Sequence, residues 1–237
     1  MKIIATICAR GGSKGLPGKN LRDFQGQPLI AHTIAHALAS PQISGVFVST
    51  DDPAIAEVAR AAGAQVPYLR PAVLANDTAP KLPVIEHLVH HLEAQGLTID
   101  CIVDLQPTSP LRDASDIAGA LQCLPGADLV VSVSEAADNP YFNLVEADVD
   151  GWLQLSKGAG NTRRQAAPEV FALNGSIYVW LREALRRSTQ PGHSLWTNRI
   201  ARYVMPRWKS VDIDDLEDFE LAQWLYVRHN RHIKGVS

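Results

Sequence analysis

A glycine-rich loop with three cations follows the first apolar run of the sequence. The loop covers residues 10–20 and reads RGGSKGLPGKN. Glycines after a strand expose backbone N–H groups, and together with Arg10, Lys14 and Lys19 they form a concave site suited to phosphate groups. A solvated basic turn is the alternative interpretation. The position directly after a buried strand favours the phosphate site.

The loop differs from two common phosphate-binding motifs. A Walker A loop requires a glycine five residues before its Gly-Lys pair, and for the pair formed by Gly18 and Lys19 that position is Ser13. The next residue is Asn20, where a Walker A loop has Ser or Thr for magnesium. No GxGxxG motif is present. These departures disfavour a P-loop kinase or GTPase.

A second group of chemistry-bearing residues is the acidic run VDIDD at 211–215. Asp212 and Asp214 alternate as on a β-strand, so both carboxylates can face the same side. Two such carboxylates form a hard-oxygen site for Mg²⁺, which would bridge phosphate oxygens. Asp215 and the acids after it are expected to begin the last helix, where negative charge offsets the helix dipole. Helix capping by all of these acids is the alternative.

Apolar runs alternate with helix-like segments along most of the chain. This alternation predicts an α/β protein with a three-layer Rossmann-like sheet and helices on both faces. In such sheets the ligand lies beyond the carboxyl ends of the strands, so the loops at 10–20, 50–52 and 106–112 should converge. We expect strands over residues 3–8, 45–50, 99–106, 127–134, 174–180 and 201–206, and helices over residues 29–40, 52–63, 83–96, 116–124, 182–188 and 216–227.

The alternating pattern is interrupted between about residues 135 and 165. This stretch carries Tyr141, Phe142 and Trp152, a VDG turn signal and a glycine-rich end. It predicts a β-rich insertion followed by a loop. Its apolar side chains need a partner surface. The remainder reads as a single domain, since 237 residues suffice for one full core.

Composition excludes several classes of protein. The formal net charge of -3 argues against a general nucleic-acid or membrane-surface binder. The three cysteines form no CxxC pair, so neither a disulfide framework nor a zinc site is indicated. The apolar stretch before Arg10 is too short for a signal peptide, and no run of about 18 apolar residues occurs. A cytoplasmic protein is expected.

Beyond the basic loop, five segments in order along the chain resemble the N-acylneuraminate cytidylyltransferases, the CMP-sialic acid synthetases. That family couples CTP to a nine-carbon 2-keto acid sugar. The resemblance therefore implies a nucleotidyltransferase of Rossmann-like fold that transfers CMP from CTP to the anomeric hydroxyl of the sugar and releases pyrophosphate. The segments are VSTDD at 48–52, LRPAVLANDTA at 69–79, LQPTSPLR at 105–112, RRQAAPEVFALNGSIYV at 163–179 and SVDIDDLEDFELA at 210–222.

The resemblance also implies which residues carry the reaction. Basic side chains neutralise the triphosphate, amides read the ribose and cytosine, and an arginine grips the sugar carboxylate. Catalytic roles fall on Arg10, Lys14, Lys19 and Asp212, and Mg²⁺ binding on Asp212 and Asp214. Nucleotide contacts fall on Arg10, Gly12, Ser13, Lys19, Asn20, Arg70 and Gln106, and sugar contacts on Gln106, Arg164, Gln165 and Asn174.

The expected mechanism is an in-line displacement. The C2 hydroxyl of the sugar attacks the α-phosphorus of CTP, and pyrophosphate leaves. The attacking hydroxyl needs a proton acceptor, which is either a metal-bound water or Asp212. The sequence leaves both open.

A homodimer is a further implication of the resemblance, with the insertion at about 135–165 as a dimerisation subdomain that reaches over the neighbouring active site. The expected partners are CTP, a 2-keto acid sugar and a second copy of the chain. An enzyme for an eight-carbon 2-keto acid sugar is the closest alternative, but the RRQ and NGSIYV segments favour the nine-carbon group. A non-catalytic nucleotide-binding protein would not need Asp212 and Asp214.

The sequence also departs from the best-known sialic acid pattern. Ala172 and Leu173 stand where a basic residue and a proline often precede the NG of the sugar loop. Lys81 follows Pro80 where small hydroxyl residues are common. The segment NPYFNLVE and the paired arginines before Gln165 are similar to relatives that activate bacterial nonulosonic acids such as legionaminic acid. These features predict a diamino-dideoxy sugar as substrate.

Overall fold

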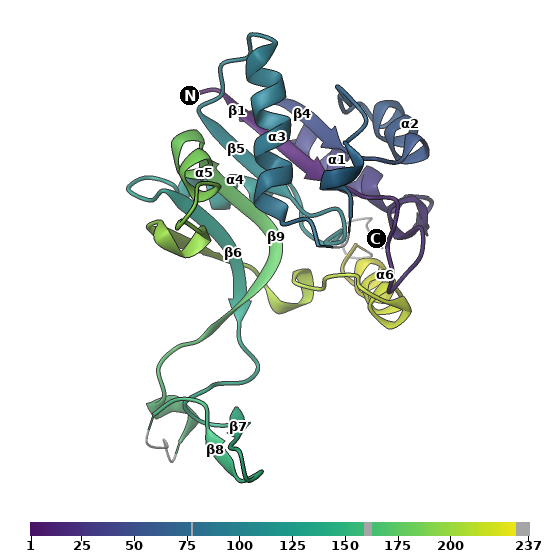
Figure 1. Ribbon diagram of the computed structural model, residues 1–237. Helices are drawn as coiled ribbons and strands as arrows, with labels where there is room; N and C mark the ends of the chain where they lie inside the picture. The colour runs from purple at the N-terminus through teal and green to yellow at the C-terminus, as the bar shows by residue number, and fades with distance from the viewer. Residues whose placement is uncertain (77, 159–162, 231–237) are drawn as a thin grey trace.

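The computed structural model describes residues 1–76, 78–158 and 163–230, and its centre is a six-stranded sheet of order β10-β6-β9-β5-β1-β4 (Figure 1). β1 pairs in parallel with β4 and β5, and β10 pairs in parallel with β6. The predicted α/β architecture is confirmed. The strands are β1 (Ile3–Cys8), β4 (Ile43–Ser49), β5 (Cys101–Leu105), β6 (Leu129–Glu135), β9 (Phe171–Leu181) and β10 (Ile200–Val204).

Helices cover both faces of the sheet and bury its apolar side chains. One face packs against Ile85 and Leu88 of α3 and Leu185 of α5. The other packs against Ile34 of α1 and Ile117 of α4, so the expected three layers are present. The helices are α1 (Leu29–Leu38), α2 (Pro53–Ala61), α3 (Lys81–Ala94), α4 (Ala114–Gln122), α5 (Arg182–Ser188) and α6 (Leu216–Asn230).

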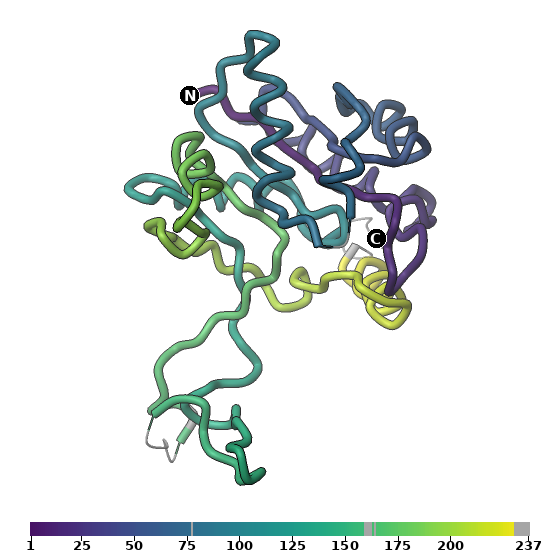
Figure 2. The backbone as a smooth tube through the Cα atoms, in the orientation of Figure 1, coloured from purple at the N-terminus to yellow at the C-terminus, as the bar shows by residue number. Residues whose placement is uncertain are grey.

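The strand β9 runs antiparallel to both of its neighbours, β5 and β6. An apolar pattern predicts a strand at this place but carries no information on its direction. The direction follows from the connection, because the chain leaves the sheet after β6 and returns from the same end of the sheet through β9 (Figure 2).

Residues 136–158 and 163–170, here called the arm, extend away from the sheet between β6 and β9 (Figures 1 and 2). The arm contains a small antiparallel hairpin of β7 (Val145–Ala147) and β8 (Leu153–Leu155). Large apolar side chains are exposed on it, including Trp152 at 74% and Leu153 at 68%. Such a surface on an extended hairpin is typical of a protein interface.

A third apolar cluster joins α6 to the basic loop and positions the site. It contains Leu16 of the basic loop, Leu111 of the loop after β5, Ile213 of the acidic segment and Phe219 of α6. The small hairpin of β2 (Asp23–Phe24) and β3 (Gln27–Pro28) closes it. Short 3₁₀ turns lie at Lys19–Leu21, Ala72–Leu74, Arg164–Ala166, Leu195–Thr197 and Arg207–Lys209.

The start of α6 follows the sequence expectation. Asp215 precedes the helix, and its Oδ1 accepts a hydrogen bond from the Asp218 N–H at 2.9 Å. The carboxylate of Asp218 in turn accepts from the Asp214 N–H at 3.0 Å. These acids therefore cap the helix and offset its dipole. Over the residues described, no helix combines the length and the apolar character needed to cross a membrane.

Candidate active site

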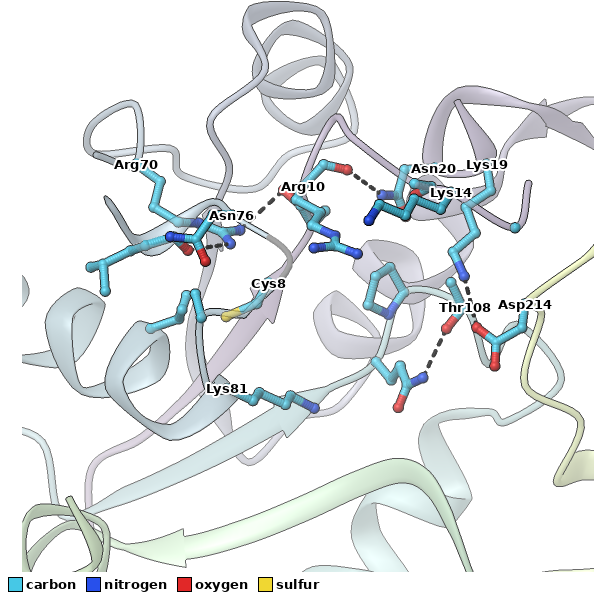
Figure 3. Close-up of a pocket in the computed structure, with 18 residues that line it drawn as sticks. Cys8, Arg10, Lys14, Lys19, Asn20, Arg70, Asn76, Lys81, Thr108 and Asp214 are labelled. Carbon is cyan, nitrogen blue, oxygen red and sulfur yellow. Dashed lines mark hydrogen bonds and ion pairs between the residues drawn. The ribbon is translucent and has the colours of Figure 1, made fainter. Parts of the chain in front are cut away.

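A pocket of about 590 Å³ lies beyond the carboxyl ends of β1 and β5 (Figure 3). The basic loop 10–20, the loop after β5 and the segment 70–84 form its walls. The Gly11 N–H donates to Asp51 Oδ1 at 3.2 Å, which joins the loop after β4 to the basic loop. The predicted convergence of the three loops is confirmed.

The cations of the basic loop line this pocket. Arg10 and Lys14 extend into its interior in Figure 3. The ammonium of Lys19 donates to the Ile213 carbonyl at 2.6 Å and to Asp214 Oδ1 at 3.1 Å. The basic loop and the acidic segment, which lie almost 200 positions apart in the sequence, are therefore parts of one site.

A glycine permits this close approach. A Cβ on Gly15 would collide with the carbonyl oxygen of Asp214, so any larger residue would displace the loop from the acidic segment. Ser13 lines the pocket, whereas Gly12 is an exposed loop residue outside the lining. A direct contact between the nucleotide and Gly12 or Ser13 stays a prediction.

Asn20 offers a buried acceptor at the end of the basic loop. Its Nδ2 donates to the Arg10 carbonyl at 3.1 Å. Its Oδ1 is buried and has no hydrogen-bond partner within the described ranges. Such an acceptor costs about 1–3 kcal/mol when left unpaired. A ribose hydroxyl of the expected nucleotide would satisfy it.

Arg70 borders the pocket but directs its guanidinium to the protein itself. Nη2 donates to the Ala9 carbonyl at 3.1 Å, Nε donates to Ser49 Oγ at 3.1 Å, and Nη1 donates to the Leu74 carbonyl at 3.4 Å. These bonds tie the ends of β1 and β4 to the segment that follows them. Arg70 thus shapes the wall, and its contact with CTP stays a prediction.

Two side chains of the loop after β5 hold Asp212. Thr108 Oγ1 donates to Asp212 Oδ1 at 2.6 Å, and Gln106 Nε2 donates to Asp212 Oδ2 at 2.7 Å. Burial raises the pKa of Asp212; the Thr108 donor opposes this effect and the charge of Asp214 reinforces it. Asp212 is therefore a fixed carboxylate with a stronger affinity for a proton than an ordinary aspartate.

The acidic segment 211–215 is not part of a strand of the sheet. Ile213 is buried, and its N–H donates to the Thr108 carbonyl at 3.0 Å. This anchor places Asp212 against the loop after β5 and leaves Asp214 in an ion pair with Lys19, its side chain 77% exposed.

The oxygen donors of Asp212 and Asp214 suit Mg²⁺, which prefers hard oxygen ligands. In the part of the chain that the structure covers, no three or more His, Cys, Asp or Glu side chains surround a common metal position. Two carboxylates would supply part of the shell, and phosphate oxygens and water the rest, as is usual for nucleotide-bound Mg²⁺. Mg²⁺ binding stays a prediction.

Strand β9 supports the site through Asn174 and Gly175. A Cβ on Gly175, whose φ is 70°, would collide with Gln106 Oε1, so glycine leaves the space that Gln106 occupies. Asn174 Oδ1 accepts from Ser132 Oγ at 2.6 Å, and Nδ2 donates to Ser210 Oγ at 2.9 Å. The amide of Asn174 thus links strands to the acidic segment, and its contact with the sugar stays a prediction.

The expected sugar-side residues Arg164 and Gln165 belong to the 3₁₀ turn Arg164–Ala166 on the arm. Gln165 is exposed, and the side chain of Arg164 lies outside what the structure describes. The arm extends away from the pocket of its own chain (Figure 1). A single chain therefore does not bring these residues to the pocket lining.

Sequence reasoning left three residues out of the candidate site; one of them, Lys81, it noted only as a departure from the sialic acid pattern. Thr108 holds Asp212, and Lys81 lines the pocket beside a buried carboxylate. Arg112 is 1% exposed and supports the loop after β5 from below, with Nη1 2.9 Å from the Gln106 carbonyl. Thr108 and Arg112 stand in the segment LQPTSPLR, whose position after a buried strand was the available signal.

Comparisons with known proteins agree with this site. The sequence profile of the cytidylyltransferases matches residues 4–150. The chain is 36% identical over 232 residues to CMP-N,N'-diacetyllegionaminic acid synthase of Campylobacter jejuni, with 97% of each chain covered. It is 34% identical over 242 residues to N-acylneuraminate cytidylyltransferase of Escherichia coli, which covers 97% of this chain and 53% of that protein.

A solved structure shares the fold. CMP:2-keto-3-deoxy-manno-octonic acid synthetase, in complex with CTP, superposes with a TM-score of 0.72 at 21% identity, covering 97% of this chain and 100% of the other. The resemblance to the N-acylneuraminate cytidylyltransferases and to their legionaminic acid branch is confirmed by the two relatives. The chain belongs to the cytidylyltransferase family.

Proposed function

We propose that this enzyme transfers CMP from CTP to the anomeric hydroxyl of a nine-carbon 2-keto acid sugar, a sialic acid or related nonulosonic acid, and releases pyrophosphate. One observation carries the proposal: the ion pair between Lys19 and Asp214 joins the cations of the basic loop to a carboxylate of the acidic segment at one pocket. The names of the two relatives, a CMP-legionaminic acid synthase and an N-acylneuraminate cytidylyltransferase, support it.

The residues of the pocket have distinct tasks in this reaction. Arg10 and Lys14 extend into the pocket; there they would bind the triphosphate and stabilise the charge of the leaving pyrophosphate. Asp212 and Asp214 would hold Mg²⁺, which supplies Lewis-acid stabilisation of phosphate oxygens when bound. Asp212 accepts the proton of the attacking hydroxyl or orients the water that accepts it. A cytoplasmic location and the absence of nucleic-acid and membrane partners belong to this proposal.

Pyrophosphate release tests the proposal directly. The protein is incubated with CTP, Mg²⁺ and a panel of eight- and nine-carbon 2-keto acid sugars, and pyrophosphate and the CMP-sugar are measured together. We expect both products in equal amounts and only when a nine-carbon acid sugar is present. Hydrolysis of ATP or GTP without any sugar would overturn the proposal, and turnover confined to the eight-carbon sugar would correct its substrate.

The preferred sugar is a separate prediction. We expect kcat/KM with N,N'-diacetyllegionaminic acid to equal or exceed kcat/KM with N-acetylneuraminate, with CTP as the preferred nucleotide for both. The reason is that Ala172 stands where a cation is common in sialic acid enzymes, and sites with different polar groups reject analogues that leave those groups unpaired. A clear preference for N-acetylneuraminate would mean that this substitution is neutral.

Assembly is a further prediction. We propose a homodimer in which the arm of one chain reaches the pocket of the other, because the exposed Trp152 and Leu153 need a partner surface. The arm would then carry Arg164 and Gln165 to the sugar of the partner's site. Light scattering should give about twice the chain mass of 25.8 kDa. A fully active monomer at micromolar concentration would contradict this assembly.

A further inference from the structure

An ion pair between a pocket-lining lysine and a buried aspartate lies at the side of the pocket opposite the basic loop. Lys81 is the first residue of α3, and its Nζ lies 2.6 Å from Asp104 Oδ2. Asp104 is fully buried at 0% exposure, and Thr6 Oγ1 donates to its other oxygen at 3.1 Å. A cation in the first turn of a helix is unfavourable with respect to the helix dipole. The pair with Asp104 offsets that cost.

The ammonium of Lys81 is held in place but still faces the pocket. Its side chain is 43% exposed, lies 5.1 Å from the centre of the Tyr178 ring, and points into the cavity in Figure 3. Burial favours the neutral amine, but Asp104 outweighs it and raises the pKa of Lys81, so the group stays charged. An ammonium has three N–H donors, and the pair with Asp104 leaves donors for a ligand.

The lining around Lys81 is otherwise apolar or already engaged. Leu74, Ala79 and Val84 line this end of the pocket. Burial raises the pKa of the neighbouring Cys8 thiol to about 12, so the thiol is neutral. The carboxamide oxygen of Asn76 accepts from the Thr78 N–H and hydroxyl, its Nδ2 donates to a backbone carbonyl, and Arg70 is bonded to backbone as described above.

This end of the pocket therefore suits a flat heterocycle that presents hydrogen-bond acceptors. We propose that Lys81 donates hydrogen bonds to the O2 and N3 acceptors of the cytosine ring and so selects CTP over UTP; the inference rests on the proposed function. The pair of Lys81 with Asp104 carries no net charge. A neutral acceptor edge fits such a pair better than the sugar carboxylate, which the Asp104 charge would repel.

Uracil differs from cytosine at the position that Lys81 would contact. Both bases have an acceptor at O2, but N3 of cytosine is an acceptor whereas N3 of uracil carries a proton. A lysine ammonium can only donate, so it faces a second donor when uracil is bound. A site built to hydrogen-bond one ligand strongly rejects a similar ligand that leaves its polar groups unpaired.

The test compares direct binding of CTP and UTP, measured by titration calorimetry, in the wild type and in variants. Lys81→Met alone would leave Asp104 buried without its cation, so the principal variant is the double change Lys81→Met with Asp104→Asn. We expect its affinity for CTP to fall roughly 10- to 100-fold while its affinity for UTP changes little. Asp104→Asn alone is the matched control, and it should keep the preference for CTP because the N–H donors of Lys81 remain.

The outcomes separate this inference from the proposed function. Binding needs no turnover, so a CTP preference that the double variant loses supports the role of Lys81 even if no acid sugar reacts. A folded double variant, shown by an intact thermal transition, that retains the wild-type ratio of CTP to UTP affinity would overturn it. A rise in KM for the sugar alone, with CTP binding unchanged, would assign Lys81 to the sugar carboxylate and also overturn it.

Discussion

Replacement of Asp212 by alanine is expected to lower turnover by at least about a hundredfold, and replacement of Asp214 to have an effect of the same order. Asp212 is oriented by Thr108 and Gln106, so its loss removes a fixed carboxylate from the reacting centre. Asp214 pairs with Lys19, so its loss would remove a proposed metal ligand and one of the partners that hold the Lys19 ammonium in place. The measurement is pyrophosphate release at saturating CTP and sugar.

Control variants distinguish the effect of losing a carboxylate charge from the effect of disturbing the fold. Asp212→Asn keeps an oxygen for one of the two donors but removes the charge, so it should lose as much activity as Asp212→Ala. Asp215→Asn lies in the same segment but acts as a helix cap, a role that asparagine fills equally well, so its turnover should stay within a few-fold. Turnover near the wild-type level in both Asp212→Ala and Asp214→Ala, at limiting Mg²⁺, would contradict the metal assignment.

The sequence was sufficient to predict the strands and helices of the central three layers and the two charged segments that meet at the pocket. Strand β1 has the predicted bounds, because an apolar run followed by a glycine-rich loop leaves few alternatives. The basic loop and the loop after β5 meet as expected, since the carboxyl ends of parallel strands share one edge of the sheet. These predictions use local patterns and one general rule of α/β topology.

Other features depend on contacts between distant residues, which a single sequence does not display. The guanidinium of Arg70, for which the family resemblance implies a nucleotide contact, donates to the carbonyl of Ala9 across 61 positions. The side-chain oxygen of Asn174 accepts a hydrogen bond from Ser132 inside the sheet, a contact that the sequence does not display either. Lys81 gains its role from Asp104, which the sequence presents as an unremarkable strand residue.

The support beneath the loop after β5 predicts a second large effect. Arg112→Met should lower the free energy of unfolding by about 3 kcal/mol, because it leaves several buried acceptors without a donor at about 1–3 kcal/mol each. Nη2 of Arg112 donates to Thr33 Oγ1 at 2.6 Å, and Nη1 lies 2.9 Å from the Ser109 carbonyl and 3.1 Å from Ser176 Oγ. Chemical denaturation measures this change.

Turnover of the same variant should also fall, by about tenfold or more, although Arg112 does not line the pocket. Its Nη1 lies 2.9 Å from the Gln106 carbonyl, and Gln106 orients Asp212, so loosening the loop displaces the carboxylate. The matched control is Arg186→Met, which removes an exposed arginine paired with Glu183 in the same helical turn, and it should change neither stability nor turnover measurably. If Arg112→Met loses stability but keeps wild-type kcat at a temperature where it is folded, the guanidinium supports the fold without positioning Gln106.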